Sequence, residues 1–275
     1  MQLSQVRYEV EAPVAHLVLD RPRYRNAQSR VLREEMDEAF AAAITDPTVR
    51  VVVLSGEGDH FSSGHDLGTP EELEDQAARP FPPGFDGRFS RSWELNVENS
   101  LRWRDLPKPT IAAVQGWCIY GGWIIASAMD LIVAADDARF VPGLVQYFTL
   151  PWDLSPRKAK EVLFQSRVVT AAEAERLGMV NQVVPRDQLL EETMALARRI
   201  AETDPFVVRM VKLAVNNTQD VAGFRASVTA NHSAYMLAQA AGAVRPPADE
   251  ASGRRRLPGV DLAIRADAEE SAGSE

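Results

Sequence analysis

The chain has 275 residues, which is enough for one large domain or two small ones around a sizeable core. Its formal net charge of −9 argues against nucleic acid or an anionic membrane surface as the main partner. A single cysteine excludes an intrachain disulfide, and no apolar run reaches the length of about 18 residues that a membrane span needs. We therefore expect a cytoplasmic protein with no membrane and no nucleic-acid partner.

The first 54 residues predict a βαβ unit. Two β-rich runs, Val6 to Val10 and Val14 to Leu19, are most simply a hairpin. From Ser29 onward apolar residues recur at helical spacing, and Asp46 followed by proline ends that pattern. The β-branched run Val49 to Leu54 is typical of a strand that is covered on both faces. A parallel sheet with right-handed crossovers is expected from this order.

The segment after this strand is less regular. A loop rich in glycine and serine, Ser55 to Gly68, comes first. Thr69 to Ser90 is acidic and then proline-rich, and we interpret it either as disordered or as a lid over a pocket. Helical spacing resumes from Trp93 to Leu106.

The stretch Lys108 to Asp130 predicts the functional centre of the chain. Thr110 to Val114 suits a buried strand, Gln115 to Gly122 a turn of small residues, and Trp123 to Met129 a buried helix. Such a turn aims the free N–H groups of the first helical turn at a pocket, where they can bind an oxygen that carries negative charge. The alternative is an ordinary strand-to-helix turn, with glycines that serve only close packing.

The remaining chain predicts further strands and a helical C-terminal region. Strands are expected at Leu131 to Ala135 and Val180 to Val184, with an apolar loop from Phe140 to Pro151 between them. Helices are expected at Pro156 to Gln165, Thr170 to Gly178, Leu189 to Ala201, Pro205 to Asn216 and Val221 to Ala241. We therefore expect a core over residues 1–201, a helical segment over residues 202–245 and a mobile tail over residues 246–275.

No motif for a metal or for a familiar nucleophile is present. The four histidines, His16, His60, His65 and His232, are scattered, and no Walker A or GxSxG pattern occurs. The single cysteine, Cys118, stands between bulky apolar residues and is expected in the core.

Five segments, in this order, carry a resemblance to a known family. They are RPRYRNA, FSSGHDL, KPTIAAVQG with the following YGG, DLIVAADDARF, and TAAEAERLGMVNQVVP. From about Val6 to Ala241 the chain resembles the crotonase (enoyl-CoA hydratase/isomerase) superfamily. The resemblance implies an α/β fold, a spiral of ββα units with a helical C-terminal region, in a homotrimer or hexamer. It also implies an acyl-CoA thioester as ligand, with coenzyme A as part of the substrate and no separate cofactor.

The family's shared site is an oxyanion hole of two backbone amides, which stabilises the enolate of the thioester. By resemblance the two donors are His65 and Gly121. The His65 ring either covers the loop or moves protons itself. The residues matched to coenzyme A binding are Arg23, Arg25, Ser63, His65, Asp66, Leu67 and Gly68, where the two arginines could equally be solvated surface charges. Glycine is needed because a Cβ would keep the backbone from approaching the ligand.

The chain departs from the family at two positions. A hydratase of this family uses two glutamates as general base and acid, and these positions fall on Ile124 and Leu144. An apolar side chain cannot shuttle a proton, and loss of a positioned acid or base costs about 10²–10⁴-fold in rate. We therefore expect slow hydration of crotonyl-CoA.

Other groups nearby are candidates for the proton-transfer role, and several residues for the acyl pocket. Tyr147 and Asp153 are the catalytic candidates, although Asp153 is also a candidate helix N-cap. In its functional role Asp153 would have a pKa raised against Trp152. Tyr120, Ile124 and Leu144 are expected to line the pocket, and the aromatic residues near the turn suit a bulky or ring-containing acyl group.

The leading hypothesis is an acyl-CoA-processing enzyme, hydratase- or lyase-like, that uses other acid and base residues than glutamate. The alternatives are a C–C bond hydrolase or an isomerase of the same superfamily, or a catalytically silent acyl-CoA-binding subunit.

Overall fold

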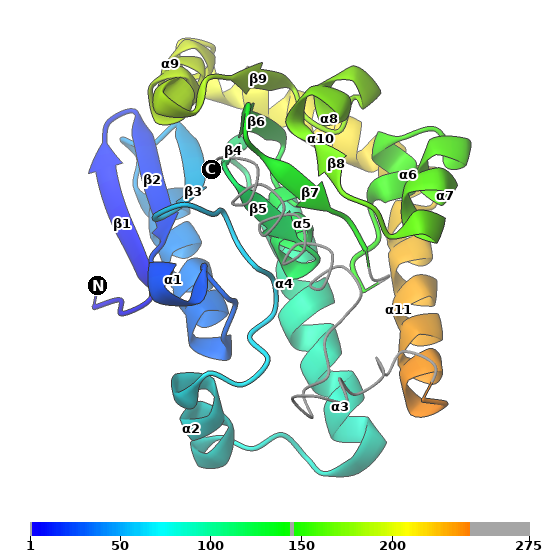
Figure 1. Cartoon of the computed structure of the whole chain (residues 1–275). Coiled ribbons are helices and arrows are strands. Elements are labelled where there is room, and N and C mark those ends of the chain that lie inside the picture. Colours follow the sequence, from blue (N-terminus) through cyan, green and yellow to red (C-terminus); the bar gives the residue numbers. More distant parts are fainter. Residues whose placement is uncertain (1, 144–145, 243–275) are drawn as a thin grey trace, which may run out of the picture.

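A six-stranded sheet runs through the centre of the computed structural model, which describes residues 2–143 and 146–242 (Figure 1). The strand order is β1-β2-β3-β4-β6-β9, and only the β1–β2 pair is antiparallel. The strands are β1 (Val6–Glu11), β2 (Val14–Leu19), β3 (Val51–Gly56), β4 (Thr110–Val114), β6 (Leu131–Ala135) and β9 (Gln182–Val184). The predicted hairpin and parallel sheet are confirmed.

Three short strands form a second, separate sheet, which the chain enters after strands of the first. It consists of β5 (Trp117–Ile119), β7 (Arg139–Val141) and β8 (Val169–Thr170). β4 leads into β5 and then into the helix α5 (Gly121–Ala126), while β6 leads into β7, so the expected ββα units are present. Sequence patterns missed β5 and β7 because strands of three residues are too short to show a period.

Helices cover both faces of the large sheet. The helix α1 (Arg30–Thr45) begins as predicted, because the Ser29 hydroxyl accepts a hydrogen bond from the Leu32 amide at 3.0 Å. Every residue of β3 is buried, with alternate side chains in two cores on opposite faces of the sheet. The helix α9 (Leu189–Ala201) covers the second core, which explains the continuous apolar run of β3.

The segment Thr69 to Ser90 forms two helices, α2 (Pro70–Ala78) and α3 (Gly84–Ser92), so the expectation of an irregular stretch was wrong. Buried Glu72 explains why. Its carboxylate accepts from the Arg30 amide at 2.9 Å and from Arg91 at 2.5 Å, which fixes α2 to both α1 and α3. The acidic character of this segment therefore reflects internal ion pairs.

The other helices follow the predicted order, except that α6 (Leu150–Asp153) was not predicted and begins inside the segment expected to be an apolar loop. A π-helical turn at Trp93–Glu98 joins α3 to α4. The helices are α4 (Asn99–Arg104), α6 (Leu150–Asp153), α7 (Pro156–Gln165), α8 (Ala171–Leu177), α10 (Pro205–Val221) and α11 (Phe224–Ala240), with 3₁₀ turns at Pro22–Tyr24 and Arg186–Gln188. The tail predicted for residues 246–275 lies outside the described residues.

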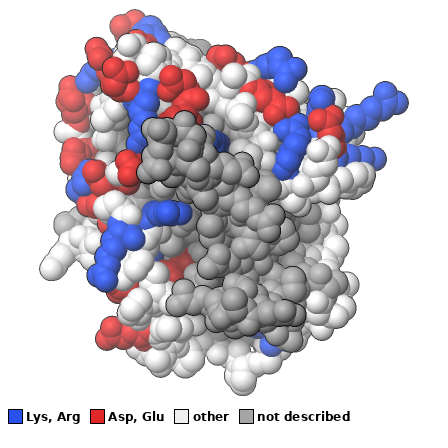
Figure 2. Space-filling view, in the orientation of Figure 1, with Lys and Arg blue, Asp and Glu red and all other residues white. Residues whose placement is uncertain are grey.

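The surface shows two features. On the face in Figure 2, acidic and basic side chains lie side by side over the upper part and along the left side. The helix α10 has no buried residue, and large apolar side chains are exposed along it, at Phe206, Val207, Met210, Val211, Leu213, Val215 and Val221.

Candidate active site

The loop after β3 lies against the beginning of α5. The Ile119 amide donates to Ser62 O at 3.0 Å, and the Ser62 amide donates to Trp117 O at 3.1 Å, so this loop pairs with β5. A Cβ added to Gly64 would lie 2.7 Å from Ile119 O and 3.2 Å from the Gly121 nitrogen. This close approach places the His65 loop and Gly121 side by side.

The backbone amides of His65 and Gly121 are both free to bind a ligand. Gln28 forms hydrogen bonds with both neighbours of His65, since its amide donates to Gly64 O at 2.8 Å and its carbonyl accepts from the Asp66 amide at 3.1 Å. In a parallel pairing of this kind, the N–H of the middle residue, His65, points to the other side. Gly121 opens α5, where an N–H has no partner inside the helix. Neither amide donates a hydrogen bond to another of the described residues.

A side chain at Gly121 would displace the side chains around it. A Cβ at this position would lie 2.8 Å from Nδ1 of His65 and 2.9 Å from Oε1 of Gln28. The preceding residue, Tyr120, holds a positive φ of 42°, which is rare for a side chain of this size. Its buried ring packs on Gly143, where a Cβ would lie 2.4 Å from the ring. Strained backbone of this kind is typical of functional sites.

The His65 ring is neutral and both of its nitrogens are engaged. Nε2 lies 2.8 Å from Oε1 of Gln146, and Nδ1 lies 3.3 Å from the Arg33 guanidinium. An arginine can only donate, so we assign Nδ1 as the acceptor and Nε2 as the nitrogen that carries hydrogen. Burial, together with the charge of Arg33, lowers the pKa of His65 to about 3. The geometry therefore favours a ring that shapes the loop over a ring that transfers protons.

Arg33 is a site residue that sequence reasoning missed. It is 1% exposed, and its guanidinium donates to Leu95 O and to Oε1 of Gln28 as well as to His65. No carboxylate of the described residues lies within ion-pair distance of it, and burial lowers its pKa to about 9. The sequence did contain one sign that Arg33 is buried. It lies on α1 three residues before buried Met36, and therefore on the helix face that normally carries apolar side chains.

Gln146 connects His65 with the C-terminal helices. Its amide nitrogen lies 3.4 Å from the Ser92 hydroxyl, which in turn lies 3.1 Å from Nε2 of His232 on α11. Gln146, Ser92 and His232 are all buried. Of the two positions matched to glutamates, Ile124 is fully buried in the main core, and Leu144 lies outside the described residues.

The loop matched to coenzyme A binding is braced by a buried carboxylate. Burial alone would raise the pKa of Asp66, but hydrogen bonds from Thr69, Gly68 and Arg21 outweigh it and lower the pKa. The Arg21 guanidinium lies 2.8 Å from this carboxylate. Asp66 therefore holds the loop in place and is not exposed to a ligand, whereas Leu67 is 75% exposed.

The remaining candidates for coenzyme A binding lie beside this loop. The Ser63 amide donates to Arg25 O at 2.8 Å, and its hydroxyl donates to Tyr24 O at 3.2 Å. Arg23 and Arg25 are exposed on the segment that follows β2, and Gly68 is exposed at the far end of the loop that follows β3. The structure thus brings the two predicted basic residues to the same surface as the glycine-rich loop.

Tyr147 and Asp153 lie in a different place. Both line a cavity of about 370 Å³ with Ser127 to Leu131, beyond the C-terminal end of α5, and with residues of α10 and α11. Neither His65 nor Gly121 lines this cavity. The Tyr147 hydroxyl is buried without a hydrogen-bond partner among residues 2–143 and 146–242. The geometry therefore gives no support to proton transfer by these two side chains at the oxyanion hole.

Asp153 is not a helix N-cap. It is the last residue of α6, and the Ser155 hydroxyl caps α7 by accepting from the Lys158 amide. The N-cap is Ser155 and not Asp153 because Pro156 is the first residue of α7, and the N-cap is the residue directly before it. Low-dielectric protein around Asp153 raises the pKa of its carboxyl group, but the side chain is exposed at the surface, so contact with water limits this shift.

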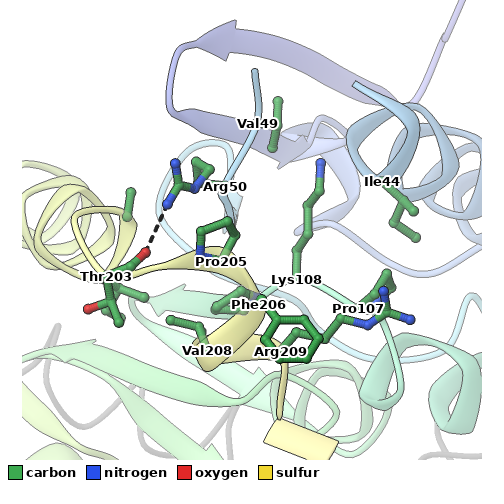
Figure 3. Close-up of a pocket in the computed structure, with 13 residues that line it drawn as sticks. Ile44, Val49, Arg50, Pro107, Lys108, Thr203, Pro205, Phe206, Val208 and Arg209 are labelled. Atoms are coloured by element: carbon green, nitrogen blue, oxygen red, sulfur yellow. Dashed lines mark hydrogen bonds between the residues drawn. The ribbon is translucent and has the colours of Figure 1, made fainter. Parts of the chain in front are cut away.

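A further cavity of about 410 Å³ lies between the start of β3 and α10, and none of its lining residues belongs to the candidate site (Figure 3). Two of its basic side chains, Lys108 and Arg50, hold backbone carbonyl groups. The Lys108 ammonium donates to Ala43 O and Asp46 O, both at 2.7 Å, and Arg50 donates to Thr203 O at 2.8 Å. Although this cavity is the larger of the two, nothing in its lining points to chemistry.

Within residues 2–143 and 146–242, no helix is long and apolar enough to cross a membrane. The same residues contain no cluster of three or more His, Cys, Asp or Glu side chains placed to hold a metal ion.

Comparison with known proteins gives the family of the chain. The family model described as Enoyl-CoA hydratase/isomerase matches residues 9–241. A Mycobacterium tuberculosis protein that carries the name enoyl-CoA hydratase EchA13 is 37% identical over 86% of this chain and 81% of its own length. The hydroxycinnamoyl-CoA hydratase-lyase of Pseudomonas fluorescens is 31% identical over 75% of this chain and 76% of its own. The crystal structure of a probable enoyl-CoA hydratase from Mycobacterium smegmatis superimposes with a TM-score of 0.80 at 40% identity, over 87% of this chain and 96% of that one. The chain has the crotonase fold and belongs to the enoyl-CoA hydratase/isomerase family, the crotonase superfamily.

Proposed function

We propose that the protein binds an acyl-CoA thioester and stabilises its enolate with the backbone amides of His65 and Gly121. The observation that carries this proposal is the contact between the two residues, whose N–H groups donate to none of the described residues, and whose side-chain surroundings leave less than 3 Å to a Cβ added at Gly121. A thioester carbonyl gains negative charge as the enolate forms. Fixed N–H dipoles stabilise that charge without reorganising, by roughly 3–4 kcal/mol for each donor.

Coenzyme A would lie along the loop that follows β3. The exposed guanidinium groups of Arg23 and Arg25 suit its phosphates, and exposed Leu67 and Gly68 offer an apolar side chain and an open backbone. Ser63 joins the two segments through its bond to Arg25 O. We assign Asp66 a supporting role in this site, because its carboxylate is already occupied.

The acyl group would be bulky or contain a ring, and the reaction would be of the hydratase or lyase class. Tyr120, Ile124 and Leu144 are the residues we propose for the acyl side of the site. The name of the relative from Pseudomonas fluorescens, a hydratase-lyase for hydroxycinnamoyl-CoA, supports an aromatic acyl group. With apolar residues at the two positions matched to glutamates, proton transfer would use groups other than that pair.

One alternative in the same superfamily is a C–C bond hydrolase or an isomerase. Another is an acyl-CoA-binding subunit without activity. The specific observation that favours the silent subunit is the neutral His65 ring, which has no free nitrogen, together with the fully buried apolar side chain of Ile124.

A screen for turnover, with mass detection, over acyl-CoA thioesters of varied chain length and ring content tests the function. Saturable turnover of a ring-containing substrate that exceeds turnover of crotonyl-CoA supports the enzyme and its acyl preference. Tight binding of thioesters without turnover of any would support the silent subunit, and no binding of any thioester would overturn the proposal.

The apolar surface of α10 supports self-association as a homotrimer or hexamer. A surface helix without a single buried residue leaves its apolar side chains in water unless another subunit covers them. Light scattering coupled to size-exclusion chromatography would give the mass of three or six chains, and a monomer would contradict this assignment. Because its one cysteine, Cys118, is buried and reduced, we also propose the cytoplasm as the compartment.

A further inference from the structure

The buried cation at the oxyanion hole has an unusual set of partners. One nitrogen of Arg33, Nη2, donates both to Oε1 of Gln28 and to Nδ1 of His65. These two acceptor atoms are also the ones that a Cβ on Gly121 would meet, at 2.9 and 2.8 Å. A single guanidinium nitrogen therefore holds the two side chains that lie against Gly121.

Arg33 cannot contact a ligand itself. It is buried, and its other terminal nitrogen, Nη1, donates to Leu95 O in the π-helical turn. The charged groups that act on it without direct contact are Asp37 on its own helix, Glu72 on α2 and Arg91 on α3. Its positive charge is thus only partly balanced, and a buried charge without a carboxylate partner is costly to keep.

We infer that Arg33 is a positioning residue for the oxyanion hole, which holds His65 as the neutral Nε2–H tautomer and Gln28 against Gly121, and whose charge adds to the stabilisation of the oxyanion. The part of this inference that concerns the oxyanion rests on the proposed function. The part that concerns the His65 ring is independent of it. Three consequences follow: a fixed tautomer of His65, a His65 ring that resists protonation, and a turnover rate that depends on the charge at position 33.

The wild-type protein gives the first test, by ¹⁵N NMR of its histidine rings across a pH titration. His65 should show a bare Nδ1 and a protonated Nε2, and it should not titrate at neutral or mildly acidic pH, in line with its pKa of about 3. The charged groups that act on this ring are Arg33 on α1 and Arg91 on α3, and neutral Gln146 bonds to it. A His65 that carries hydrogen on Nδ1, or that titrates with an ordinary pKa, overturns the inference without any substitution.

The second test compares Arg33→Met with the matched substitution Arg30→Met. Arg30 is also buried on α1, but its guanidinium faces Asp75 at 3.4 Å and the Arg79 carbonyl, and not His65. Arg33→Met should raise the pKa of His65 by at least about one unit and lower kcat about tenfold or more, with a smaller change in KM. Arg30→Met should lower stability and leave the His65 spectrum and kcat unchanged.

The outcomes separate this inference from the proposed function. If thioesters are turned over, but Arg33→Met leaves both His65 and kcat as they are in the wild type, Arg33 is only structural and the inference fails alone. If His65 responds as expected but no thioester binds to the wild-type protein, the proposed function fails and the positioning of His65 by Arg33 stands.

Discussion

The neutral state of His65 predicts a measurable loss of stability in acid. In the folded protein burial and Arg33 lower the pKa of His65 to about 3, whereas an unfolded histidine has a pKa of about 6.5. The folded pKa lies below the unfolded one, so the unfolded state takes up a proton first as the pH falls. The contribution of His65 to stability is therefore complete above about pH 6.5 and is lost progressively toward about pH 3.

The expected size follows from these two values. At about pH 5 an unfolded histidine gains about 2 kcal/mol from protonation, while the folded His65 gains almost nothing. Since the ring is not completely buried, we expect about 1–2 kcal/mol of lost stability between about pH 7.5 and pH 5 from this residue alone.

The assay is urea unfolding of the wild type and His65→Gln at these two pH values. Glutamine is neutral at both, so the drop in unfolding free energy from pH 7.5 to pH 5 should be about 1–2 kcal/mol smaller in the variant. Other groups with lowered pKa, such as His16 and His232, contribute equally to both proteins and cancel in the comparison. An identical pH dependence of the unfolding free energy in the two proteins would refute the conclusion that the enclosed His65 ring stays neutral in the folded protein.

Four further experiments address the Gly121 turn, the Asp66 carboxylate, the Tyr147 hydroxyl and the coenzyme A site. Gly121→Ala should lower turnover about a hundredfold, because the added Cβ displaces the side chains around the hole, and Gly178→Ala, with no atom within 4 Å of its added Cβ, should cost stability but not turnover. Asp66→Ala leaves the Arg21 guanidinium without its buried partner and should lower the unfolding free energy by about 3–5 kcal/mol, which a denaturant titration would show; a loss below about 1 kcal/mol would mean that the loop is not braced this way. Tyr147→Phe removes a hydroxyl that has no partner, so kcat should stay within about twofold, and a loss of 10²-fold would restore Tyr147 as an acid or base. An acyl-CoA thioester should raise the melting temperature while the free acid does not, and equal shifts from both would count against a coenzyme A site.

The fold could be predicted from the sequence wherever a long segment has a clear period. The β-branched run that became β3 and the capped helix α1 begin or end within two residues of their predicted positions. The helices α2 and α3 could not be predicted, because they depend on a buried carboxylate, Glu72, whose partners come from two other helices. Local patterns carry no information about such contacts.

The candidate site was predictable only in its backbone. Gly121 and the His65 loop could be matched by motif, and the structure brings them into contact. Arg33 and the bond from Gln146 to His65 depend on residues far apart in the chain, and Arg33 resembled one more charge on an amphipathic helix. The predicted proton-transfer groups Tyr147 and Asp153 lie at the other end of α5, because closeness in sequence to the site did not mean closeness in space.

In the proposed site the amides of His65 and Gly121 polarise a thioester carbonyl. Infrared difference spectroscopy measures this polarisation directly. The ligand is an acyl-CoA that binds but does not react, labelled with ¹³C at the thioester carbonyl. We predict that the carbonyl stretch of the ligand shifts to lower frequency on binding. Gly121→Pro, which lacks the donor, should lose a large part of this shift while circular dichroism shows a folded protein. A ligand that binds with the carbonyl frequency it has in water, or an equal shift in a folded Gly121→Pro, would contradict the proposed oxyanion hole.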